Sequence, residues 1–352
     1  MHYHTFCAAN SGDGFISFFD TLTDEENSNV YYIKGGPGSG KSTLLKRVAK
    51  LAKNAELIYC SGDPSSLDAV VLPDQNTVIF DATNPHSYEP KFPAVGGNII
   101  DLGEGWDPSK MNKMRILEIN KQKSNVYKSC YSLLKSAKEI HAAIFEPILY
   151  HTQKDRMLAA TDRLLKQLSL WENNNRPATV TKRFLSAISP NGRHTFTDTI
   201  RKLCKKIVVI EDRWMISHML LAHIDQVLSS RGIDHINSYH PLLGREVLHH
   251  ILIPCADIAF VTKDGLFALE FDDEEIYKKI VIQSYIEKDY LNDRKNKLTF
   301  IKRMMKEHLN LSCEKLYEAR SLHMELESEY AKGTDFSKTD HLKENLISKL
   351  FG

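Results

Sequence analysis

One segment near the N-terminus constrains the fold more than any other part of this 352-residue chain. Residues 30–49 read VYYIKGGPGSGKSTLLKRVA, and the stretch that begins at Gly35 matches G-x-x-x-x-G-K-[ST], the pattern of a phosphate-binding loop. Residues 30–33 are apolar, as a short buried strand requires. After the glycines, apolar side chains recur at helical spacing, at Leu44, Leu45 and Val48. A strand, this loop and a helix in that order predict a P-loop unit of an α/β protein.

Each residue type in the loop suits the binding of a nucleotide phosphate. Glycine allows backbone conformations closed to other residues, and the loop amides and the start of the helix attract an anion. We expect Lys41 to reach the β- and γ-phosphates of ATP, the Ser42 hydroxyl to ligate Mg²⁺, and Thr43 to contact the α-phosphate. The expected nucleotide-binding residues are Gly35, Gly36, Pro37, Gly38, Ser39, Gly40, Lys41, Ser42 and Thr43.

A second segment supplies the carboxylate that a Mg²⁺ site also needs. Residues 77–83 read TVIFDAT, an apolar strand that ends at Asp81, as in a Walker B motif. A carboxylate at the end of the strand beside a P-loop holds Mg²⁺ directly or through a water molecule. We therefore expect Ser42 and Asp81 to form the metal site.

Three further polar residues follow strands near these motifs. Asp63, in YCSGDP, either orients a water or an acceptor hydroxyl or is a turn aspartate. His86 and Glu89, in NPHSYEP, either sense the γ-phosphate or belong to a capped surface loop. With Asp63, the expected catalytic residues are Lys41 and Asp81.

Composition excludes several other classes of protein. The formal net charge of +1 gives no attraction to nucleic acid or anionic lipid, and no apolar run approaches the length of a membrane helix. The six scattered cysteines indicate reduced thiols and a cytoplasmic location. The paired histidines at 2/4 and 249/250 lack the spacing of a zinc site.

The second half of the chain resembles a degraded copy of the first. FCAANSGDGFISFFD at 6–20 aligns with FLSAISPNGRHTFTD at 184–198, at an offset near 180 that holds along the chain. The segment KIVVIEDRWMISHMLLAHI, residues 206–224, then aligns with the P-loop segment. In this alignment Gly35, Gly40 and Lys41 fall on Asp212, Ser217 and His218, Asp81 falls on Thr262, and His141 falls on His323.

The aligned residues have lost the chemistry of phosphate binding. Glu211 and Asp212 would meet a phosphate with like charge, and neither the glycines nor the lysine is kept. We expect this half to keep the fold without binding nucleotide in the usual way. His218, in the place of the lysine, is expected to be packed or solvated.

These patterns predict an α/β protein of two tandem P-loop NTPase-like units with mostly parallel sheets. The units should span residues 1–175 and 183–352, joined by the polar linker 171–182, and each should end in a long helical region. Apolar stripes on those helices fit either packing within each unit or a coiled-coil arm for a protein partner or self-association.

Nearly the whole chain resembles a family of bacterial tandem P-loop proteins described as ATPases or nucleotide kinases. The resemblance is carried by YIKGGPGSGKSTLLKRV, IYCSGDPSSLDAVVLP, the segment from Asp81 to His86, and LGEGWD. In that family each half can carry its own P-loop. This sequence matches the first, at 35–43, and departs from the second, so the resemblance implies one ATP site and does not indicate a substrate.

The leading expectation is a Mg²⁺-dependent ATPase with a single N-terminal site and a regulatory or scaffolding second half. A P-loop kinase acting on a nucleotide or another small acceptor, and a non-catalytic nucleotide-sensing interaction protein, remain alternatives. Arg47, Arg193 and Arg201 are available to neutralise transition-state charge, and their spacing selects none of them.

Overall fold

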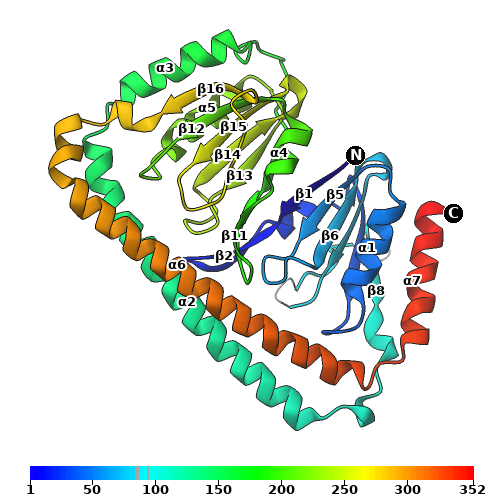
Figure 1. The fold of residues 1–352 in the computed structure, drawn as a ribbon. Coiled ribbons are helices and arrows are strands. Elements are labelled where there is room, and N and C mark those ends of the chain that lie inside the picture. The colour runs from blue at the N-terminus through cyan, green and yellow to red at the C-terminus, as the bar shows by residue number, and fades with distance from the viewer. Residues whose placement is uncertain (85–86, 93–94) are drawn as a thin grey trace. The chain divides into compact units, whose positions relative to one another are not determined.

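The computed structural model describes residues 1–84, 87–92 and 95–352, and it shows an α/β protein with two six-stranded mixed sheets (Figure 1). In sheet order the first contains β1 (His2–Phe6), β5 (Ala55–Tyr59), β6 (Leu67–Leu72), β7 (Thr77–Asp81), β4 (Asn29–Lys34) and β8 (Gly97–Asp101). The second contains β9 (Val180–Arg183), β13 (His235–Tyr239), β14 (Leu248–Ile253), β15 (Ile258–Lys263), β12 (Lys206–Glu211) and β16 (Ile276–Val281).

The two sheets have the same topology, strand for strand. In each, the first two strands pair in parallel, the third is antiparallel to both neighbours, and the last three are parallel. The register also agrees, because Ile33 pairs with Asp81 and Ile210 pairs with Thr262. The structure therefore shows the internal repeat that the alignment predicts, with Thr262 in the place of Asp81.

The expected mostly parallel sheets are in fact mixed. The reversed strands β6 and β14 are joined to the next strand by the short 3₁₀ turns Pro73–Gln75 and Pro254–Ala256. A connection this short permits only antiparallel pairing, because a parallel neighbour needs a crossover of about a dozen residues or more.

Two hairpins and seven α-helices complete the described part of the chain. The hairpins are β2 (Ala8–Ser11) with β3 (Gly14–Ser17), and β10 (Ser186–Ser189) with β11 (Gly192–Thr195). The helices are α1 (Lys41–Leu51), α2 (Lys113–Tyr150), α3 (Lys154–Gln167), α4 (Thr197–Leu203), α5 (His218–Ser230), α6 (Lys288–Ala331) and α7 (Phe336–Phe351). Among these helices none is both long enough and apolar enough to cross a membrane.

The compact units do not follow the boundaries 1–175 and 183–352 expected from the sequence. The first unit contains residues 1–7, 18–130 and 314–352, and the second contains residues 8–17 and 131–313. Each half of the sequence keeps its own sheet, but α2 and α6 each contribute residues to both units. Helices of 38 and 44 residues are roughly 57 and 66 Å long, which exceeds the diameter of one small domain.

The expected linker is also part of a unit. Asn174 donates its amide N–H to the Arg231 carbonyl, and Arg176 forms an ion pair of 2.7 Å with Asp234. These contacts anchor residues 171–182 within the second unit.

The core of the first unit lies between its sheet and α1. Leu44, Leu45 and Val48, the helical stripe predicted after the glycines, are fully buried against strand residues such as Ile33 and Ile79. Each such side chain stabilises the fold by about 1.5–3 kcal/mol, and together they fix the start of α1 at the end of β4. The apolar stripes of α2 and α6 are buried as well, at Val126, Cys130, Ala137, Ile144, Leu298, Met305, Leu309 and Leu316, which favours packing within the chain.

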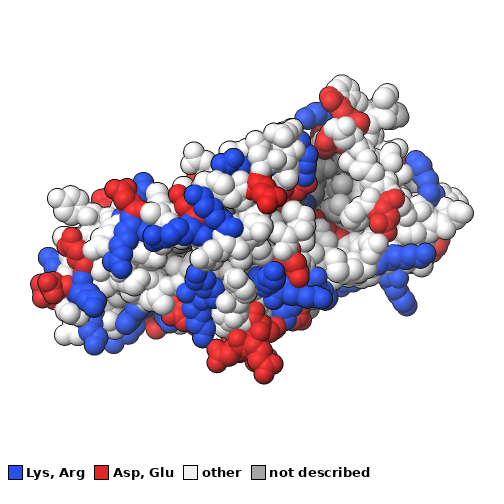
Figure 2. All heavy atoms as spheres, turned by 90° about the horizontal axis from the view of Figure 1, so that it is seen from above, with Lys and Arg blue, Asp and Glu red and all other residues white. Residues whose placement is uncertain are grey.

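The charged surface is mixed in sign. On the face drawn in Figure 2, Lys and Arg side chains are interspersed with Asp and Glu, as the formal net charge of +1 leads one to expect.

Candidate functional site

The candidate site lies in the first unit, where the chain passes from β4 into α1. Between Lys34 and Lys41 the backbone takes positive φ at Gly35 (141°), Gly38 (73°) and Gly40 (88°). Side chains other than glycine rarely adopt these conformations, so the glycine pattern of the motif is what lets the loop turn here.

Lys41, the first residue of α1, folds back across the loop. Its Nζ donates to the Gly35 carbonyl at 2.7 Å and the Gly36 carbonyl at 2.9 Å, and lies 3.6 Å from Asp81 Oδ2. Asp81 ends β7, and the register with β4 places it beside the strand that enters the loop. The structure thus brings together the two residues expected to be most important for phosphate and Mg²⁺.

The remaining expected ligands line the same region. Ser42 Oγ accepts the Leu67 amide at 3.1 Å, and Ser39, which is fully buried, donates to the Gly36 carbonyl at 2.9 Å. The Thr43 side chain is exposed and the Pro37 ring is half-buried.

Asp81 is a suitable ligand for a cation. Burial raises the pKa of its carboxyl, while Lys41 and the hydrogen bonds from Thr83 oppose that shift. When neighbouring groups compensate the charge of a buried carboxylate only in part, a nearby divalent cation stabilises that charge further. The chemistry of Asp81 and Ser42 therefore fits Mg²⁺.

Asp63 is arranged as a turn residue and not as a base. Its carboxylate accepts hydrogen bonds from the hydroxyls of Ser65 at 2.8 Å and Ser66 at 2.7 Å, and it lies 2.9 Å from Arg320 Nε. Burial alone would raise its pKa, but these hydroxyls, the Ser65 amide and Arg320 together lower it. A carboxylate with a low pKa and occupied lone pairs is a weak proton acceptor, so the turn interpretation is the better one.

The segment after β7 contains the other two residues considered as phosphate sensors. Glu89 forms an ion pair of 2.6 Å with Lys34, whose Nζ also donates to the Ala82 and Tyr88 carbonyls. This contact favours a structural role for Glu89. His86 lies outside the described residues.

The arginines named from the sequence are engaged elsewhere. Arg47 pairs with Glu344 at 2.7 Å, Arg193 donates to Asn310, and Arg201 pairs with Glu275. Arg320 of α6, which the sequence did not suggest, forms an ion pair with Asp63.

Trp106 and residues of the C-terminal helices α6 and α7 lie directly against the loop, and sequence reasoning missed them. A Cβ placed on Gly36 would lie 2.8 Å from the Trp106 ring, and one on Gly40 would lie 2.8 Å from Lys343 Nζ. Trp106 in turn stacks at a tilt with Tyr330 of α6, their ring centroids 5.7 Å apart. Of these residues only Trp106, in LGEGWD, lies in a segment that the sequence analysis quotes. The other residues are separated from the loop by about 300 positions, so no local pattern could connect them with it.

A lysine of α2 and a histidine of α6 lie against each other, and the histidine also feels the charge of Lys41. Lys123 Nζ lies 3.3 Å from His323 Nδ1. Burial, followed by the charges of Lys123 and Lys41, lowers the pKa of His323 to about 4. His323 is therefore neutral at physiological pH, and it adds no positive charge to that of Lys41.

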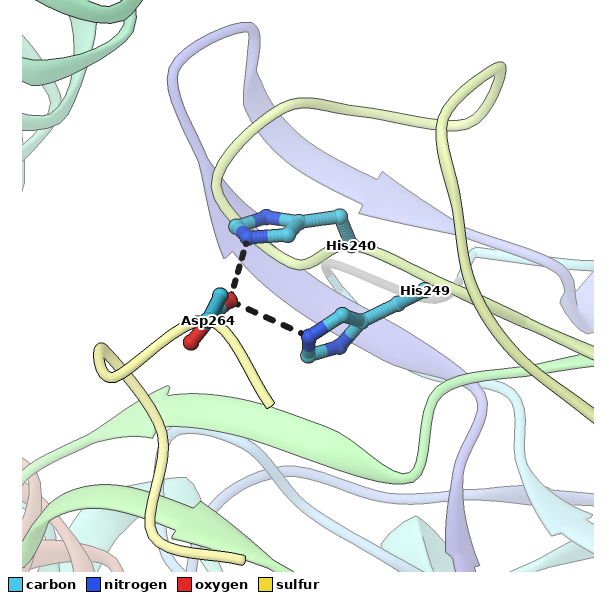
Figure 3. Close-up of side chains that lie close together, drawn as sticks. All are labelled: His240, His249 and Asp264. Carbon is cyan, nitrogen blue, oxygen red and sulfur yellow. Dashed lines mark hydrogen bonds and ion pairs between the residues drawn. The ribbon is translucent and has the colours of Figure 1, made fainter. Parts of the chain in front are cut away.

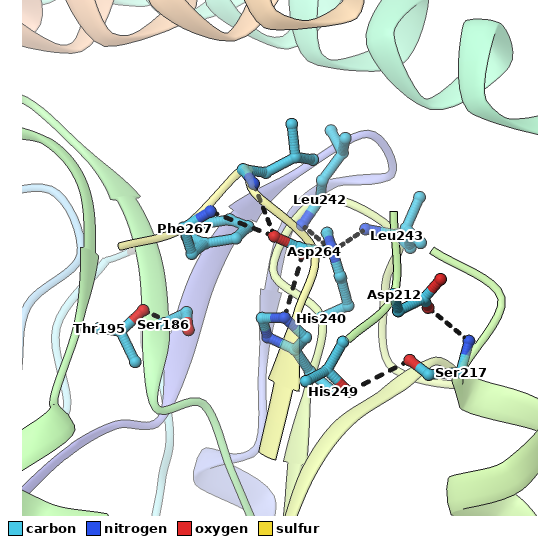
Figure 4. Close-up of polar contacts among 12 residues, drawn as sticks. Ser186, Thr195, Asp212, Ser217, His240, Leu242, Leu243, His249, Asp264 and Phe267 are labelled. Carbon is cyan, nitrogen blue, oxygen red and sulfur yellow. Dashed lines mark hydrogen bonds and ion pairs between the residues drawn. The ribbon is translucent and has the colours of Figure 1, made fainter. Parts of the chain in front are cut away.

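The corresponding loop of the second unit lacks the glycines and keeps only one of the three positive φ angles, since Ser217 has φ −62° where Gly40 has φ 88°. Met215 has φ 58° where Gly38 has φ 73°, an uncommon conformation for a side chain of this size. The loop amide of Trp214 donates to the buried Asp212 carboxylate at 3.1 Å, and that of Ser217 donates to it at 2.6 Å (Figure 4 shows the Ser217 contact). The loop thus already binds an anion that belongs to the chain itself.

Beside that loop three buried side chains converge: His240, His249 and Asp264 (Figure 3). The Nε2 atoms of the two histidines lie 3.3 and 3.2 Å from Asp264 Oδ2. They line, with Ser217 and His218, a cavity of about 10 Å³, room for one water or one ion. Sequence reasoning missed this cluster because its members follow no metal-ligand spacing.

The hydrogen bonds around this cluster do not suit a metal ion. His240 Nδ1 accepts the amides of Leu242 and Leu243 at 3.2 and 3.4 Å (Figure 4). A neutral imidazole carries one hydrogen, so the hydrogen of His240 is on Nε2, which leaves no lone pair there for a metal. The second oxygen of Asp264 accepts the Leu266 and Phe267 amides at 2.6 and 3.2 Å, which completes a closed network.

Comparison with known proteins adds no relative. No family model, curated protein or solved structure matches the chain. The geometry of the glycine-rich loop from Gly35 to Lys41 is therefore what points to a function.

Proposed function

We propose that this protein binds Mg²⁺–ATP at its N-terminal P-loop and hydrolyses it there, while the second unit serves as a scaffold or regulator. The observation that supports this most is the convergence of Lys41 and Asp81, 3.6 Å apart, at a loop that three glycines turn into the start of α1. The N-terminal end of a helix, the amides of a glycine-rich loop and a lysine are groups that bind polyphosphate in proteins.

The roles of the residues follow from their positions. The loop amides would hold the phosphates, and Lys41 would exchange its bonds to the Gly35 and Gly36 carbonyls for phosphate oxygens. Ser42 and Asp81 would hold Mg²⁺, which neutralises charge on the phosphates. Asp63 would hold Arg320 by its ion pair.

The second unit has the same topology but a different loop chemistry. The carboxylate of Asp212 accepts the loop amides, and His218 stands where Lys41 stands in the first unit. Both features oppose the binding of a phosphate, which supports a single ATP site per chain.

Equilibrium binding of ATP in the presence of Mg²⁺ tests this proposal. We expect one ATP per chain for the wild type, and a loss of affinity of at least tenfold in Lys41→Ala, because an ion pair to phosphate is removed. The matched control is His218→Ala at the equivalent position of the repeat, which should leave the affinity unchanged. Equal affinity of the wild type and Lys41→Ala would refute a P-loop site.

A further inference from the structure

Asp68, the second residue of β6, is a buried carboxylate close to the P-loop. The residue is only 6% exposed, which is rare for an aspartate. The amide of the residue before it, Leu67, donates to the Ser42 hydroxyl at 3.1 Å. The main chain next to Asp68 therefore contacts one of the two expected ligands of Mg²⁺.

The pairing of β6 with β7 brings Asp68 to the other expected ligand, Asp81. The two strands are antiparallel, and Ala69 lies opposite Phe80. One residue further along this register, Asp68 comes opposite Asp81. Residues that face each other on antiparallel strands have their Cβ atoms about 4.5–5.5 Å apart. In agreement with this register, burial raises the pKa of the Asp81 carboxyl and the charge of Asp68 adds to the rise.

Asp68 is also the extra residue of a β-bulge. Ile58 of β5 pairs with Ala69, but the next residue, Tyr59, pairs with Leu67. Two residues of β6 thus oppose one residue of β5. Bulges are frequent beside active sites, where they change the direction of a side chain.

The side chains of Asp68 and Asp81 lie on one face of the sheet, the face that α1 covers. Val70 and Leu72 follow Asp68 by two and four positions, and both are buried in the core against α1. Ile79 precedes Asp81 by two positions and belongs to the same core. Because side chains alternate between the two faces of a strand, both carboxylates share the face on which α1 begins.

The second unit has the same bulge. Ser238 of β13 pairs with His250 of β14, but the next residue, Tyr239, pairs with Leu248, so His249 is the extra residue. The strands β13 and β14 occupy the places in their sheet that β5 and β6 occupy in the first. His249 therefore takes the place that the aspartate has in the first unit.

The surroundings of His249 show what this bulge residue faces. His249 lines the cavity beside the second loop together with His218 and Thr262. His218 begins α5 as Lys41 begins α1, and Thr262 has the register of Asp81. In the second unit the bulge residue thus faces the equivalents of the phosphate-binding lysine and of a Mg²⁺ ligand.

We propose that Asp68 is the general base of the ATPase, the carboxylate that orients the attacking water and accepts its proton. The water oxygen forms a bond to the γ-phosphorus, the bond from that phosphorus to the β–γ bridging oxygen breaks, and ADP leaves with the electron pair. The proton of the water passes to Asp68 and from there to solvent. The inference deepens the proposed function and depends on it, and it supplies the base that Asp63, held in its turn, does not.

The test separates catalysis from binding in the full chain. Asp68→Asn should lower kcat for phosphate release from Mg²⁺–ATP by about 100-fold or more, the effect of losing a general base, and should bind ATP no more weakly than the wild type. Asp68→Glu moves the carboxylate by one methylene and should release phosphate about tenfold more slowly or worse. Glu56→Gln is the matched control: Glu56 is a buried carboxylate of β5 that accepts the Thr5 hydroxyl at 2.6 Å, and its loss should leave kcat unchanged.

The outcomes separate this inference from the function on which it depends. Circular dichroism checks that each variant is folded, and Asp68→Glu carries the test if Asp68→Asn is not. Phosphate release at the wild-type rate in a folded Asp68 variant, while Lys41→Ala releases none, would refute the base and leave the ATPase standing.

Two other results would also refute the base. Mg²⁺–ATP affinity that falls about tenfold in Asp68→Asn would make Asp68 a ligand of the metal instead. An equal loss of kcat in Glu56→Gln would show a general effect of buried charge in the sheet. If the wild type itself releases no phosphate, both this inference and the proposed function are refuted.

Discussion

Replacing Asp264 with asparagine should destabilise the second unit by about 3 kcal/mol. The carboxamide oxygen of the asparagine can still accept hydrogen bonds from the Leu266 and Phe267 amides. The NH₂ group of the asparagine then faces the Nε2 atoms of two histidines. His249 can move its hydrogen to Nδ1, which has no hydrogen-bond partner, and accept from the new donor. His240 cannot, because its Nδ1 accepts two main-chain amides.

The magnitude follows from these contacts. The loss of one hydrogen bond to a buried charge costs about 1.5–3 kcal/mol of folding free energy. The new NH₂ group and the Nε2–H of His240 then face each other as two donors without an acceptor, which costs about 1–3 kcal/mol more. For a unit of this size, about 3 kcal/mol lowers the midpoint of thermal unfolding by roughly 10 °C, which circular dichroism or calorimetry measures. Asp225→Asn is the control, since that half-exposed carboxylate also pairs with a histidine, His235 at 2.7 Å, and should cost about 1 kcal/mol.

The same assay tests whether the cluster binds a metal. With the hydrogen of His240 on Nε2, neither EDTA nor added Zn²⁺ should change the unfolding midpoint of the wild type. A midpoint that falls with EDTA and returns with Zn²⁺, or an Asp264→Asn variant as stable as the wild type, would refute the closed hydrogen-bond network.

Two further predictions concern stability. Burial lowers the pKa of His141 and of His240 to about 4, below the 6.5 of an exposed histidine, so the unfolded chain binds more protons between these values. The stability that the neutral histidines contribute to the folded state is present above pH 6.5 and is lost as the pH falls toward 4. Between pH 7 and pH 5 the free energy of unfolding should fall by about 2 kcal/mol for each histidine. Urea unfolding at the two pH values measures it, and equal stability would contradict the burial of neutral histidines. Separately, Leu45→Ala should cost about 2–5 kcal/mol because Leu45 is fully buried behind the P-loop. A loss below 1 kcal/mol in the same assay would show that α1 is not packed as described.

Local patterns predicted the parts of the structure that depend on neighbours in sequence. The strand, the glycine loop and the start of α1 at Lys41 follow from turn and helix chemistry within about 20 residues. The similarity of the two halves was visible because both keep the same apolar strands, and the two sheets share one order of parallel and antiparallel pairs.

Contacts between distant segments could not be predicted in the same way. The apolar stripes of α2 and α6 show that one face is buried, but periodicity does not say which unit a given turn joins. The approach of Glu327 to Gly38 and the meeting of His240 with Asp264 depend on that packing. The reversed strands were missed because apolar runs do not reveal direction, which the short turns set instead.

Release of phosphate from Mg²⁺–ATP tests the central claim most directly. Purified wild type should release phosphate, and both Lys41→Ala and Asp81→Asn should lose that release, since one removes the charge nearest the phosphates and the other a ligand of Mg²⁺. His218→Ala should release phosphate at the rate of the wild type. Wild-type protein that neither binds ATP nor releases phosphate, or release that survives in Lys41→Ala, would contradict an ATPase at the N-terminal P-loop.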